Sequence, residues 1–302
     1  MKAVIVGGMG FLGGAVVNVL LSRGDEVVVV DPHTSQALVD ERFGAGAVRL
    51  AVVDMGDGAA LTAALRGADE VYHFGGRLGT TELDSDVIAA IEANVVGAVT
   101  VFESAIAAGV PGVFYPSKPN VWLNTYTITK VAAEEFARLF AASHAIRIPI
   151  LRLFNAYGPG QATGPVRKII PSFAMEALRG RPLTVYGDGE QTVDMIHAED
   201  AARLAVALMR GTSSATPLDG GRGIPLTVNE VAEAVNRVAG NTAGIRHVPM
   251  RKGETPNTKL VANIGPLRDA VGDFQFVPWE STLADTVEWY RRRYASELGV
   301  PR

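Results

Sequence analysis

The chain has 302 residues, of which 48% are hydrophobic and 20% are charged, and its formal net charge is −4 at pH 7. This balance fits a globular protein with one large core or two linked domains, and it speaks against nucleic acid or an anionic membrane as the partner. The sequence contains no cysteine, which excludes disulfides, thiolate metal sites and a cysteine nucleophile and is compatible with a reducing compartment.

Export signals and membrane spans are not expected. The first apolar strand already starts at Ala3, which leaves no room for a signal peptide, and no uninterrupted apolar run reaches the ~18 residues of a membrane helix. We therefore expect a soluble, cytoplasmic protein that has no membrane or nucleic-acid partner and no metal site.

A strand, a glycine-rich turn and a helix follow one another at the start of the chain. Ala3–Val6 is an apolar run of strand length, and residues 7–13 (GGMGFLG) lead directly into a helical stretch. Gly7 and Gly10 would allow positive φ and a close backbone approach to a pyrophosphate, and Gly13 would let the helix pack tightly on the strand. With the donors of the helix N-terminus, this pattern predicts a dinucleotide-binding turn.

An acidic residue follows the second predicted strand. Residues 26–30 form a buried apolar run that ends in Asp31. A carboxylate at this place binds a ribose diol and repels a 2′-phosphate, which predicts NAD rather than NADP. The alternative is a plain turn residue before Pro32.

Strands and helices continue to alternate as far as residue 154. Strands are predicted at 48–53, 70–74, 112–115 and 148–154, and helices at 59–65, 86–108 and 126–142. Such alternation is typical of a parallel sheet covered on both faces. After Asn155, Gly-Pro pairs break the pattern, and further helices are predicted at 168–178, 198–209, 228–239 and 283–292.

These patterns together predict an α/β fold. Residues 1–155 should form a Rossmann-type doubly wound parallel sheet that binds NAD. Residues 156–302 should form a smaller mixed α/β substrate-binding domain, from which some segments return to the sheet.

A tyrosine and a lysine stand four positions apart in the helix predicted at 126–142. Tyr126 and Lys130 would lie on one helix face, about 5 to 6 Å apart. A neighbouring ammonium stabilises phenolate and lowers the pKa of a tyrosine from ~10 towards the working range. The pair therefore predicts a general base, although the same spacing also occurs as a solvated helical pair.

Several ordered motifs make the chain similar to the extended short-chain dehydrogenase/reductase family, and within it to the nucleotide-sugar epimerases and dehydratases. Residues 7–13 resemble its G-x-x-G-x-x-G, 54–57 (DMGD) its adenine-binding D-x-x-D, 71–76 (VYHFGG) its nicotinamide-side strand and 94–97 (NVVG) its helical Asn motif. Tyr126 and Lys130 match the catalytic pair, and 151–159 (LRLFNAYGP) match the segment that opens the substrate side. Residues 185–189 (VYGDG) and 251–254 (RKGE) resemble segments that hold the nucleotide of a sugar donor.

This resemblance implies NAD as cofactor and a nucleotide-diphosphate sugar, first of all a UDP-sugar, as substrate. The implied cofactor-binding residues are Gly7, Gly10, Phe11, Leu12, Gly13, Asp31, Asp54, Met55, Phe74, Gly75, Asn94, Tyr126 and Lys130. The implied substrate-binding residues are Gly76, Arg77, Asn155, Arg167, Tyr186, Arg251 and Glu254.

Some of these roles can be stated more closely. Arg251 and Asn155 are the first candidates for the diphosphate, before Arg167 and Lys168, and Tyr186 for stacking on the base; the alternatives are surface charges and a core aromatic. Asn94 is expected to hydrogen-bond across to the active-site region. His73 and His197 are expected to be structural imidazoles with satisfied hydrogen bonds. The helices that start at 86 and 126 would pair with their copies in a homodimer.

The segment before Tyr126 departs from the family pattern. There, a Ser or Thr after the fifth strand helps to bind the sugar hydroxyl, about twenty or more residues before the Tyr. Here only eight steps separate Ser117 from Thr125, and Lys118 falls in the Ser/Thr position. The hydroxyl role therefore stays open between Ser117 and Thr125. A second departure is Val193, which stands where the family has an Arg that binds the diphosphate.

The short loop resembles that of inverting UDP-N-acetylhexosamine dehydratases, whose Asp-Lys pair sits where Ser117 and Lys118 sit here. The Asp is missing, and so are the Asp-Glu pair of retaining dehydratases and the Glu of uronate decarboxylases. The last two absences weaken the retaining-dehydratase and decarboxylase interpretations.

The chemistry of the expected reactions separates the alternatives. A 4-epimerase needs one base and a retained NAD, whereas a dehydratase needs an additional acid/base pair, for which Lys118 is the only obvious extra group. We expect an NAD-dependent nucleotide-diphosphate-sugar 4-epimerase that acts through a transient 4-keto sugar. A 4,6-type dehydratase that uses Lys118 is the alternative, before simple 4-keto reduction and decarboxylation, and a non-catalytic NAD-binding sensor is the alternative from another class. The catalytic candidates are Tyr126, Lys130, Lys118, Ser117 and Thr125.

Overall fold

The structure is a computed structural model, and it describes residues 1–119, 121–211, 214–251 and 254–298. The described residues divide into two compact units. Unit 1 comprises Met1–Leu153, Ala201–Gly220 and Gly265–Phe274. Unit 2 comprises Phe154–Asp200, Gly221–Ile264 and the described part of Gln275–Arg302.

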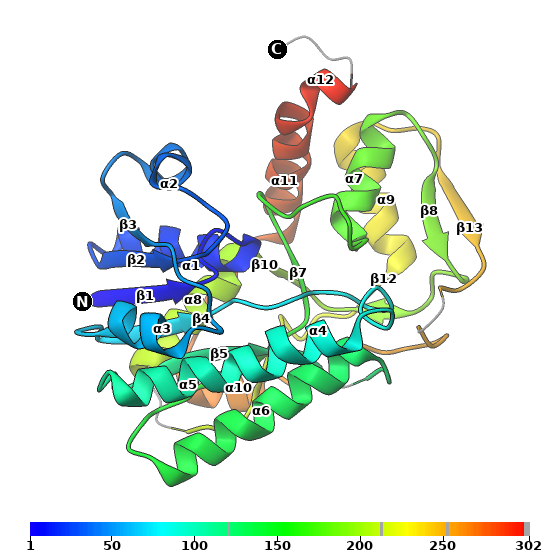
Figure 1. Ribbon diagram of the computed structural model, residues 1–302. Coiled ribbons are helices and arrows are strands. Elements are labelled where there is room, and N and C mark those ends of the chain that lie inside the picture. The colour runs from blue at the N-terminus through cyan, green and yellow to red at the C-terminus, as the bar shows by residue number, and fades with distance from the viewer. Residues whose placement is uncertain (120, 212–213, 252–253, 299–302) are drawn as a thin grey trace. The chain divides into compact units, whose positions relative to one another are not determined.

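Unit 1 is built on a seven-stranded parallel sheet with the order β11-β6-β5-β4-β1-β2-β3 (Figure 1). Its strands are β1 (Lys2–Val6), β2 (Glu26–Val30), β3 (Val48–Ala51), β4 (Glu70–His73), β5 (Val113–Ser117), β6 (Ile150–Leu153) and β11 (Leu218–Gly220). The strand order reverses between β1 and β4, so the sheet has a topological switch point at its centre. The predicted α/β fold with a Rossmann-type parallel sheet is confirmed.

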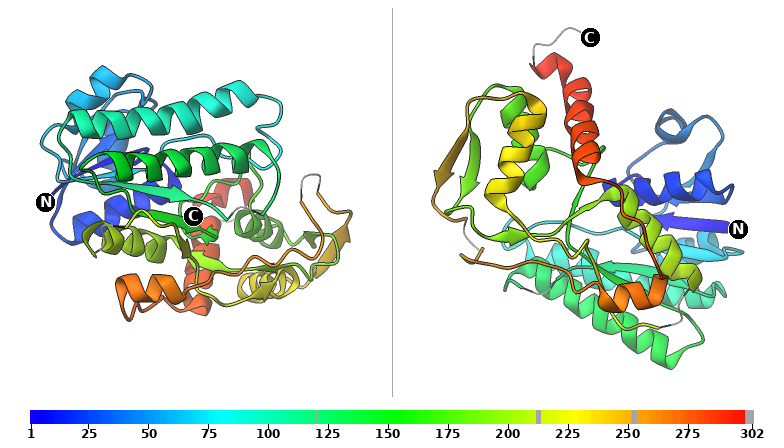
Figure 2. Two further views of the ribbon diagram at one scale, coloured as in Figure 1. Left: turned by 90° about the horizontal axis from the view of Figure 1, so that it is seen from below. Right: turned by 180° about the vertical axis from the view of Figure 1, so that it is seen from behind.

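Helices cover both faces of this sheet. Figure 2 (left) shows α5 and α6 on one face and α8 and α10 on the other. The helices of unit 1 are α1 (Phe11–Ser22), α2 (Gln36–Phe43), α3 (Gly58–Leu65), α4 (Val87–Ile91), the π-helical turn η1 (Glu92–Val96), α5 (Gly97–Ala107), α6 (Thr125–Ser143), α8 (Ala198–Gly211, of which the first three residues belong to unit 2) and α10 (Gly265–Val271).

Valine-rich strands form the centre of unit 1. The register pairs Val4 of β1 with Val28 of β2 and with Val71 of β4, and all three side chains are buried. Because a parallel sheet with helices on both faces is buried on both sides, its strands are continuous apolar runs rather than alternating ones.

A buried polar cluster ties α8 to the sheet. The carboxylate of Glu70, at the start of β4, is 1% exposed and accepts hydrogen bonds from Arg210 Nε at 2.8 Å and from the Tyr72 hydroxyl at 2.8 Å. Arg210 also donates to Asp25 at 2.8 Å. A buried carboxylate that keeps its guanidinium avoids the cost of an uncompensated charge, so α8 belongs to the sheet although it lies far along the chain.

Unit 2 combines short two-stranded sheets with helices. Its strands are β7 (Asn155–Tyr157), β8 (Leu183–Tyr186), β9 (Thr192–Val193), β10 (Met195–His197), β12 (Leu226–Thr227) and β13 (Ile245–Val248), and its helices are α7 (Ile169–Leu178), α9 (Val228–Ala239), α11 (Trp279–Arg293) and α12 (Ala295–Leu298). The parallel pairs are β7–β10 and β8–β13, and β9–β12 is antiparallel. A separate core lies between α7, α9, α11 and β8.

The helical stretch Val87–Ala107 corrects one expectation. By length and composition it can cross a membrane, because the mean hydropathy of its 18-residue window is 1.5. It is not an uninterrupted apolar run, because Glu92 and Glu103 lie within it. One such helix is weak evidence for a membrane span, since core helices of soluble proteins pass the same test.

Candidate active site

The glycine-rich turn between β1 and α1 forms a cradle that only glycine fits. Gly7 has φ 79°, and a Cβ atom there would lie 2.7 Å from the backbone nitrogen of Gly75. A Cβ atom on Gly13 would lie 2.3 Å from the carbonyl oxygen of Gly7, while Gly10 closes the turn through its N–H to the same oxygen at 3.0 Å. Phe11 then opens α1. This turn has the shape that a bound pyrophosphate requires.

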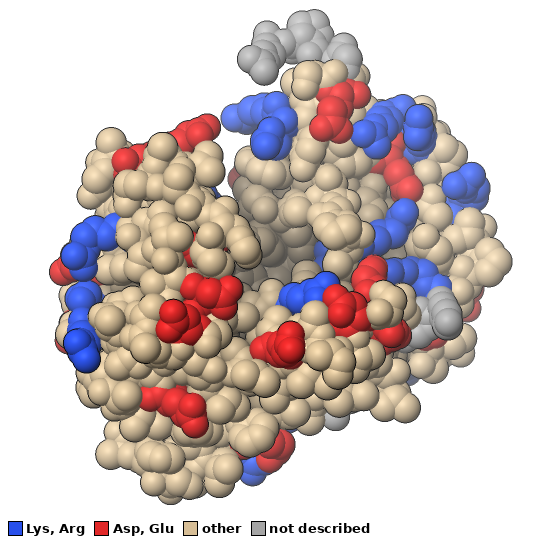
Figure 3. All heavy atoms as spheres, viewed as in Figure 1, with Lys and Arg blue, Asp and Glu red and all other residues tan. Residues whose placement is uncertain are grey.

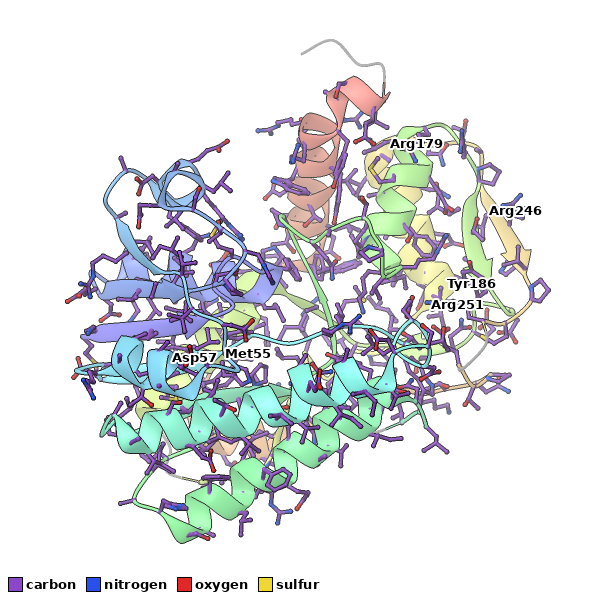
Figure 4. The ribbon with its side chains drawn as sticks, in the orientation of Figure 1. Met55, Asp57, Arg179, Tyr186, Arg246 and Arg251 are labelled. Atoms are coloured by element: carbon purple, nitrogen blue, oxygen red, sulfur yellow. The ribbon has the colours of Figure 1, made fainter. Side chains whose placement is uncertain are left out.

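Acidic residues follow β2 and β3 at the same edge of the sheet. Asp31 comes directly after β2, and its Oδ1 accepts the N–H of His33 at 3.0 Å. Asp54 accepts the N–H of Gly56 at 2.7 Å, and Asp57 caps α3 (Figure 4). The carboxyl ends of parallel strands lie at one edge of the sheet. Asp31 and Asp54 therefore lie at the same edge as the glycine turn.

Met55 and Phe74 line the neighbouring strand ends. A Cβ atom on Gly75 would lie 2.8 Å from Met55 Sδ, so the thioether needs a glycine beside it. Phe74 stacks on Phe114 at 5.8 Å between ring centroids. With the glycine cradle and Asp31, these residues fit an NAD molecule.

Asn94 bridges two parts of unit 1 from inside the π-helical turn η1. It is 4% exposed, and its Oδ1 accepts the backbone N–H of Arg77 at 2.7 Å. Its Nδ2 donates to the Arg77 carbonyl oxygen at 3.0 Å and to Thr129 Oγ1 at 3.1 Å. Gly76 allows this approach, because a Cβ atom there would lie 2.8 Å from Asn94 Oδ1. Asn94 therefore joins the end of β4 to α6.

Tyr126 and Lys130 lie in the first turns of α6, which starts behind the N-cap Asn124. The ammonium of Lys130 lies 4.1 Å from the centroid of the Tyr115 ring. Burial lowers the pKa of Lys130 to about 7, against the opposing influence of Glu134. Burial also raises the pKa of Tyr126 to about 12. The expected lowering of the Tyr126 pKa by Lys130 is therefore wrong for the ligand-free protein, because desolvation of the phenolate dominates.

The three candidates before Tyr126 have different surroundings. Ser117 ends β5, is 5% exposed, and its hydroxyl has no hydrogen-bond partner among the described residues. Thr125 Oγ1 donates to Asp84 Oδ1 at 2.6 Å. Lys118 Nζ donates to the Pro119 carbonyl oxygen at 2.6 Å and to Thr127 Oγ1 at 2.8 Å, and it lies 6.0 Å from the centroid of the Tyr126 ring. Of the two hydroxyls, that of Thr125 is committed to the protein.

His73, which is buried, and His197, which is partly buried, differ from expectation in one respect. Within the described part of the chain, Nδ1 of His73 and Nδ1 of His197 find no hydrogen-bond partner. Burial, followed by the charge of Lys130, lowers the pKa of His73 to about 3, and burial lowers the pKa of His197. Both imidazoles are thus neutral and packed against aromatic rings, but their hydrogen bonds are not fully satisfied.

Sequence reasoning missed an ion pair beneath α6. Glu134 is 1% exposed and receives Arg152 Nε at 3.1 Å and Arg152 Nη2 at 2.5 Å. The signal was present, because Glu134 follows Lys130 by the same four positions that separate Lys130 from Tyr126. A partner 18 residues further along, on β6, could not be read from spacing.

Two arginines lie near the ring of Tyr186 in unit 2. The guanidinium carbons of Arg167 and Arg251 lie 5.4 Å and 5.8 Å from the centroid of its ring. Figure 4 shows Tyr186 and Arg251 side by side, with Arg246 further along β13. Glu176 receives Arg167 at 3.0 Å, and Glu254 receives Arg251 at 3.2 Å. Of residues 251–254, Lys252 and Gly253 lie outside the described residues.

Asp194 has a structural role beside the departure at Val193. Its fully buried carboxylate accepts the backbone N–H groups of Arg222 and Gly223 at 2.8 Å and of Ala262 at 3.1 Å. Burial nevertheless raises the pKa of Asp194. Val193 is buried in the core of unit 2. A charged Arg side chain at this position would be surrounded by apolar residues, which is unfavourable. Asp194 thus organises three loops.

The remaining substrate candidates lie in both units. Arg77, in unit 1, pairs with the exposed Asp86 at 2.7 Å. Asn155 begins β7 in unit 2, where its backbone N–H donates to the carbonyl oxygen of Asp194 at 3.0 Å. Among the described residues, no group of three or more His, Cys, Asp or Glu side chains could hold a metal ion.

Comparison with known proteins identifies the family. Residues 3–217 match the NAD dependent epimerase/dehydratase family. The chain belongs to this family. Its members are NAD-dependent enzymes that modify nucleotide sugars, so the predicted family and enzyme class are confirmed.

Relatives with three different activities resemble this family member. A UDP-N-acetyl-alpha-D-glucosaminuronate decarboxylase of Bacillus cytotoxicus is 27% identical and aligns over 96% of this chain and 98% of its own length. A UDP-glucose 4-epimerase of Azospirillum brasilense is 28% identical over 90% and 86%. The crystal structure of the dTDP-glucose 4,6-dehydratase DesIV of Streptomyces venezuelae, with NAD bound, has a TM-score of 0.87 and 27% identity over 98% of both chains. These relatives share the family but carry out three different reactions.

Proposed function

We propose that the chain is an NAD-dependent nucleotide-diphosphate-sugar 4-epimerase. In this proposal unit 1 holds NAD through the glycine turn, Asp31 and Asn94, and unit 2 recognises the nucleotide. When bound, NAD supplies the hydride acceptor and donor for the sugar carbinol. The reaction class follows from the family, and the choice of epimerisation follows from the surroundings of Tyr126 and Lys118.

Tyr126 acts as the base of the proposed reaction. Its phenolate takes the proton of the sugar 4-hydroxyl when the 4-keto sugar forms, and the resulting phenol returns that proton when the hydroxyl reappears in the other configuration. The charge of Lys130 favours the phenolate, while burial opposes it. The buried hydroxyl of Ser117, at the carboxyl end of β5, is the better of the two candidates for binding the sugar hydroxyl because Thr125 is held by Asp84.

The contacts of Lys118 carry the preference for epimerisation. A dehydratase must remove the C5 proton and protonate the departing C6 hydroxyl, which needs a second acid/base group. Lys118 Nζ already donates to Thr127 Oγ1 and to the Pro119 carbonyl oxygen. Held as a donor in this way, its ammonium serves as a fixed charge near Tyr126 rather than as a base. Tyr126 then remains as the only assigned base, which suffices for an epimerase.

The surroundings of Tyr186 support a nucleotide-diphosphate donor. An aromatic ring with two guanidinium groups nearby offers a stacking surface for a base and charge-assisted donors for phosphates. Val193 stands where the family pattern has a diphosphate-binding arginine. In this proposal Arg251 and Arg167 therefore make the main contacts with the diphosphate. We propose a UDP-sugar as the substrate, with Asn155 and Glu254 as further contacts.

The reaction is tested by incubating the purified protein with NAD and a panel of UDP- and dTDP-sugars in deuterated water. Epimerisation gives the 4-epimer without solvent deuterium in the sugar. Loss of water with deuterium at C5 or C6 would overturn the proposal in favour of dehydration, which the position of Lys118, 6.0 Å from the Tyr126 ring, also permits. Binding of NAD without turnover of any donor would favour a non-catalytic sensor.

We also propose a cytoplasmic homodimer. Apolar side chains are exposed on the two neighbouring helical stretches 87–96 and 125–143, among them Ile88 (68%), Ile128 (55%) and Leu139 (57%). The face over α5 and α6 carries few charges (Figure 3). A second copy that packs on these helices would cover side chains that are otherwise costly to expose.

A further inference from the structure

The ammonium of Lys130 is subject to influences of opposite sign. It lies 4.1 Å from the centroid of the buried Tyr115 ring, a cation–π contact that favours the charge, and it faces the neutral imidazole of His73 from β4. Burial alone favours the neutral amine of a lysine. A neutral Lys130 would leave Tyr126 without the cation that its role as base requires.

Glu134 provides the nearest opposing charge. It follows Lys130 by four positions on α6, so the two side chains lie on one helix face about 5 to 6 Å apart at their Cβ atoms. The other titratable groups that face Lys130 are Tyr126 on its own helix, Tyr115 on β5 and His73 on β4, and none of these three carries a negative charge at neutral pH. Glu134 thus supplies the negative field at this position.

Arg152 holds the carboxylate of Glu134 in place. Its Nε and Nη2 bind the two carboxylate oxygens separately, which fixes the plane of the carboxylate. Arg152 also lies in the field of Asp219 on β11. The charges therefore alternate from Lys130 to Glu134, Arg152 and Asp219.

We propose that Glu134, held by Arg152, is a positioning residue that favours the ammonium form of Lys130 beside Tyr126. This inference rests on the proposed function, in which Lys130 supports Tyr126 as base. A purely structural link between α6 and β6 is the competing explanation. It predicts that removal of the Glu134 charge changes stability and leaves the protonation of Lys130 untouched.

The test follows the titration of Lys130 by NMR in protein labelled with ¹³C at lysine Cε, with assignment from a Lys130→Arg variant. In Glu134→Gln the titration midpoint should move to lower pH by about 1 unit, the scale expected for loss of one nearby opposite charge. Glu134→Asp keeps the charge and should restore most of the shift. Glu135→Gln is the matched control, because the neighbouring Glu135 is exposed and pairs with Arg138 on the outer side of the same helix.

A second variant guards against misfolding of Glu134→Gln, which leaves the guanidinium of Arg152 without its carboxylate. Glu134→Gln combined with Arg152→Gln removes both charges and should retain the shift to lower pH. An unchanged Lys130 midpoint in a folded variant would overturn the inference. This titration needs no substrate. Its outcome is therefore independent of whether the protein turns over any of the UDP- and dTDP-sugars. With an active donor, the alkaline limb of the pH–rate profile should move in the same direction.

Discussion

Asn94 Nδ2 donates to Thr129 Oγ1 at 3.1 Å, which fixes η1 to α6 one residue before Lys130. The π-helical turn gives Asn94 the direction that this bond requires, and such turns often accompany functional positions. The same amide binds the backbone of Arg77. One side chain therefore sets the distance between the end of β4 and the helix that carries the proposed base.

Removal of the Tyr126 hydroxyl should abolish turnover and leave NAD binding intact. Tyr126→Phe keeps the ring but cannot accept the substrate proton, and general-base catalysis contributes at least about 100-fold. Turnover is measured on an active donor, and NAD binding by fluorescence quenching. Glu135→Gln, at an exposed position of the same helix, keeps Tyr126 and serves as a comparison for damage to the helix. A Tyr126→Phe variant with normal turnover would refute the assigned base.

Removal of the Lys130 ammonium should stabilise the protein. The pKa of Lys130 is about 7 in the folded protein, against an ordinary lysine value of 10.5, so the unfolded chain binds the extra proton between these values. The cost of burying the charge is therefore complete below pH 7 and disappears as pH rises towards 10.5. Lys130→Met should raise the Tm at about pH 6, and the difference from wild type should shrink at about pH 10. An equal difference at both pH values would contradict the lowered pKa.

Truncation of Arg251 should weaken nucleotide binding. Loss of a charge-assisted contact to a phosphate is expected to reduce the affinity for UDP at least about tenfold. Arg246→Ala is the matched control, because Arg246 lies on β13 and donates to Thr184 at 3.3 Å. Isothermal titration calorimetry with UDP measures both variants. Equal loss in the two would indicate a general effect of charge instead of a contact by Arg251.

Removal of the Asp194 carboxylate should destabilise the protein. Asp194→Ala leaves buried N–H groups without acceptors, and we expect the free energy of unfolding to fall by about 2–5 kcal/mol. Asp188→Ala is the comparison at an exposed carboxylate that accepts one turn N–H from Glu190, and it should cost less than about 1 kcal/mol. Urea unfolding measures both variants. Similar small losses would show that the three loops do not depend on Asp194.

A charge among the exposed apolar side chains of the helical stretches 87–96 and 125–143 should convert the proposed dimer into monomers. Leu139→Glu places a carboxylate among side chains that a second copy would bury, at a cost too large for a stable dimer. Leu38→Glu on α2 is the control, since Leu38 is 50% exposed but lies on another helix. Light scattering coupled to gel filtration gives the mass. A wild-type protein that is monomeric at micromolar concentration would end the dimer proposal.

The sequence predicted the parts of unit 1 that depend on local patterns. The valine runs of β1 and β2, the glycine turn and the spacing of Tyr126 and Lys130 all act within a few residues, so periodicity was enough to place them. β11 has only three residues, Leu218–Gly220, and its membership of the sheet depends on pairing with β6, which no local pattern shows.

The electrostatics of the candidate site could not be predicted in the same way. Spacing placed Lys130 beside Tyr126, but the pKa of each depends on how much water the fold removes around it, and that removal dominates over their mutual effect. The Arg152–Glu134 pair and the bond from Thr125 to Asp84 join residues 18 and 41 positions apart. The hydroxyl choice between Ser117 and Thr125 is open at the level of sequence, and the second of these contacts supports our proposal of Ser117.

The discontinuous composition of unit 1 limits how this enzyme can be taken apart. A fragment that stops near residue 155 would contain the glycine turn, Tyr126 and Lys130, but it would lack α8, α10 and the edge strand β11. Glu70 would remain in the fragment without the guanidinium of Arg210. Unit 2 therefore cannot be exchanged as one contiguous block, and chimaeras that seek a new donor specificity must graft 154–200, 221–264 and the segment from 275 onward as separate inserts into a retained sheet.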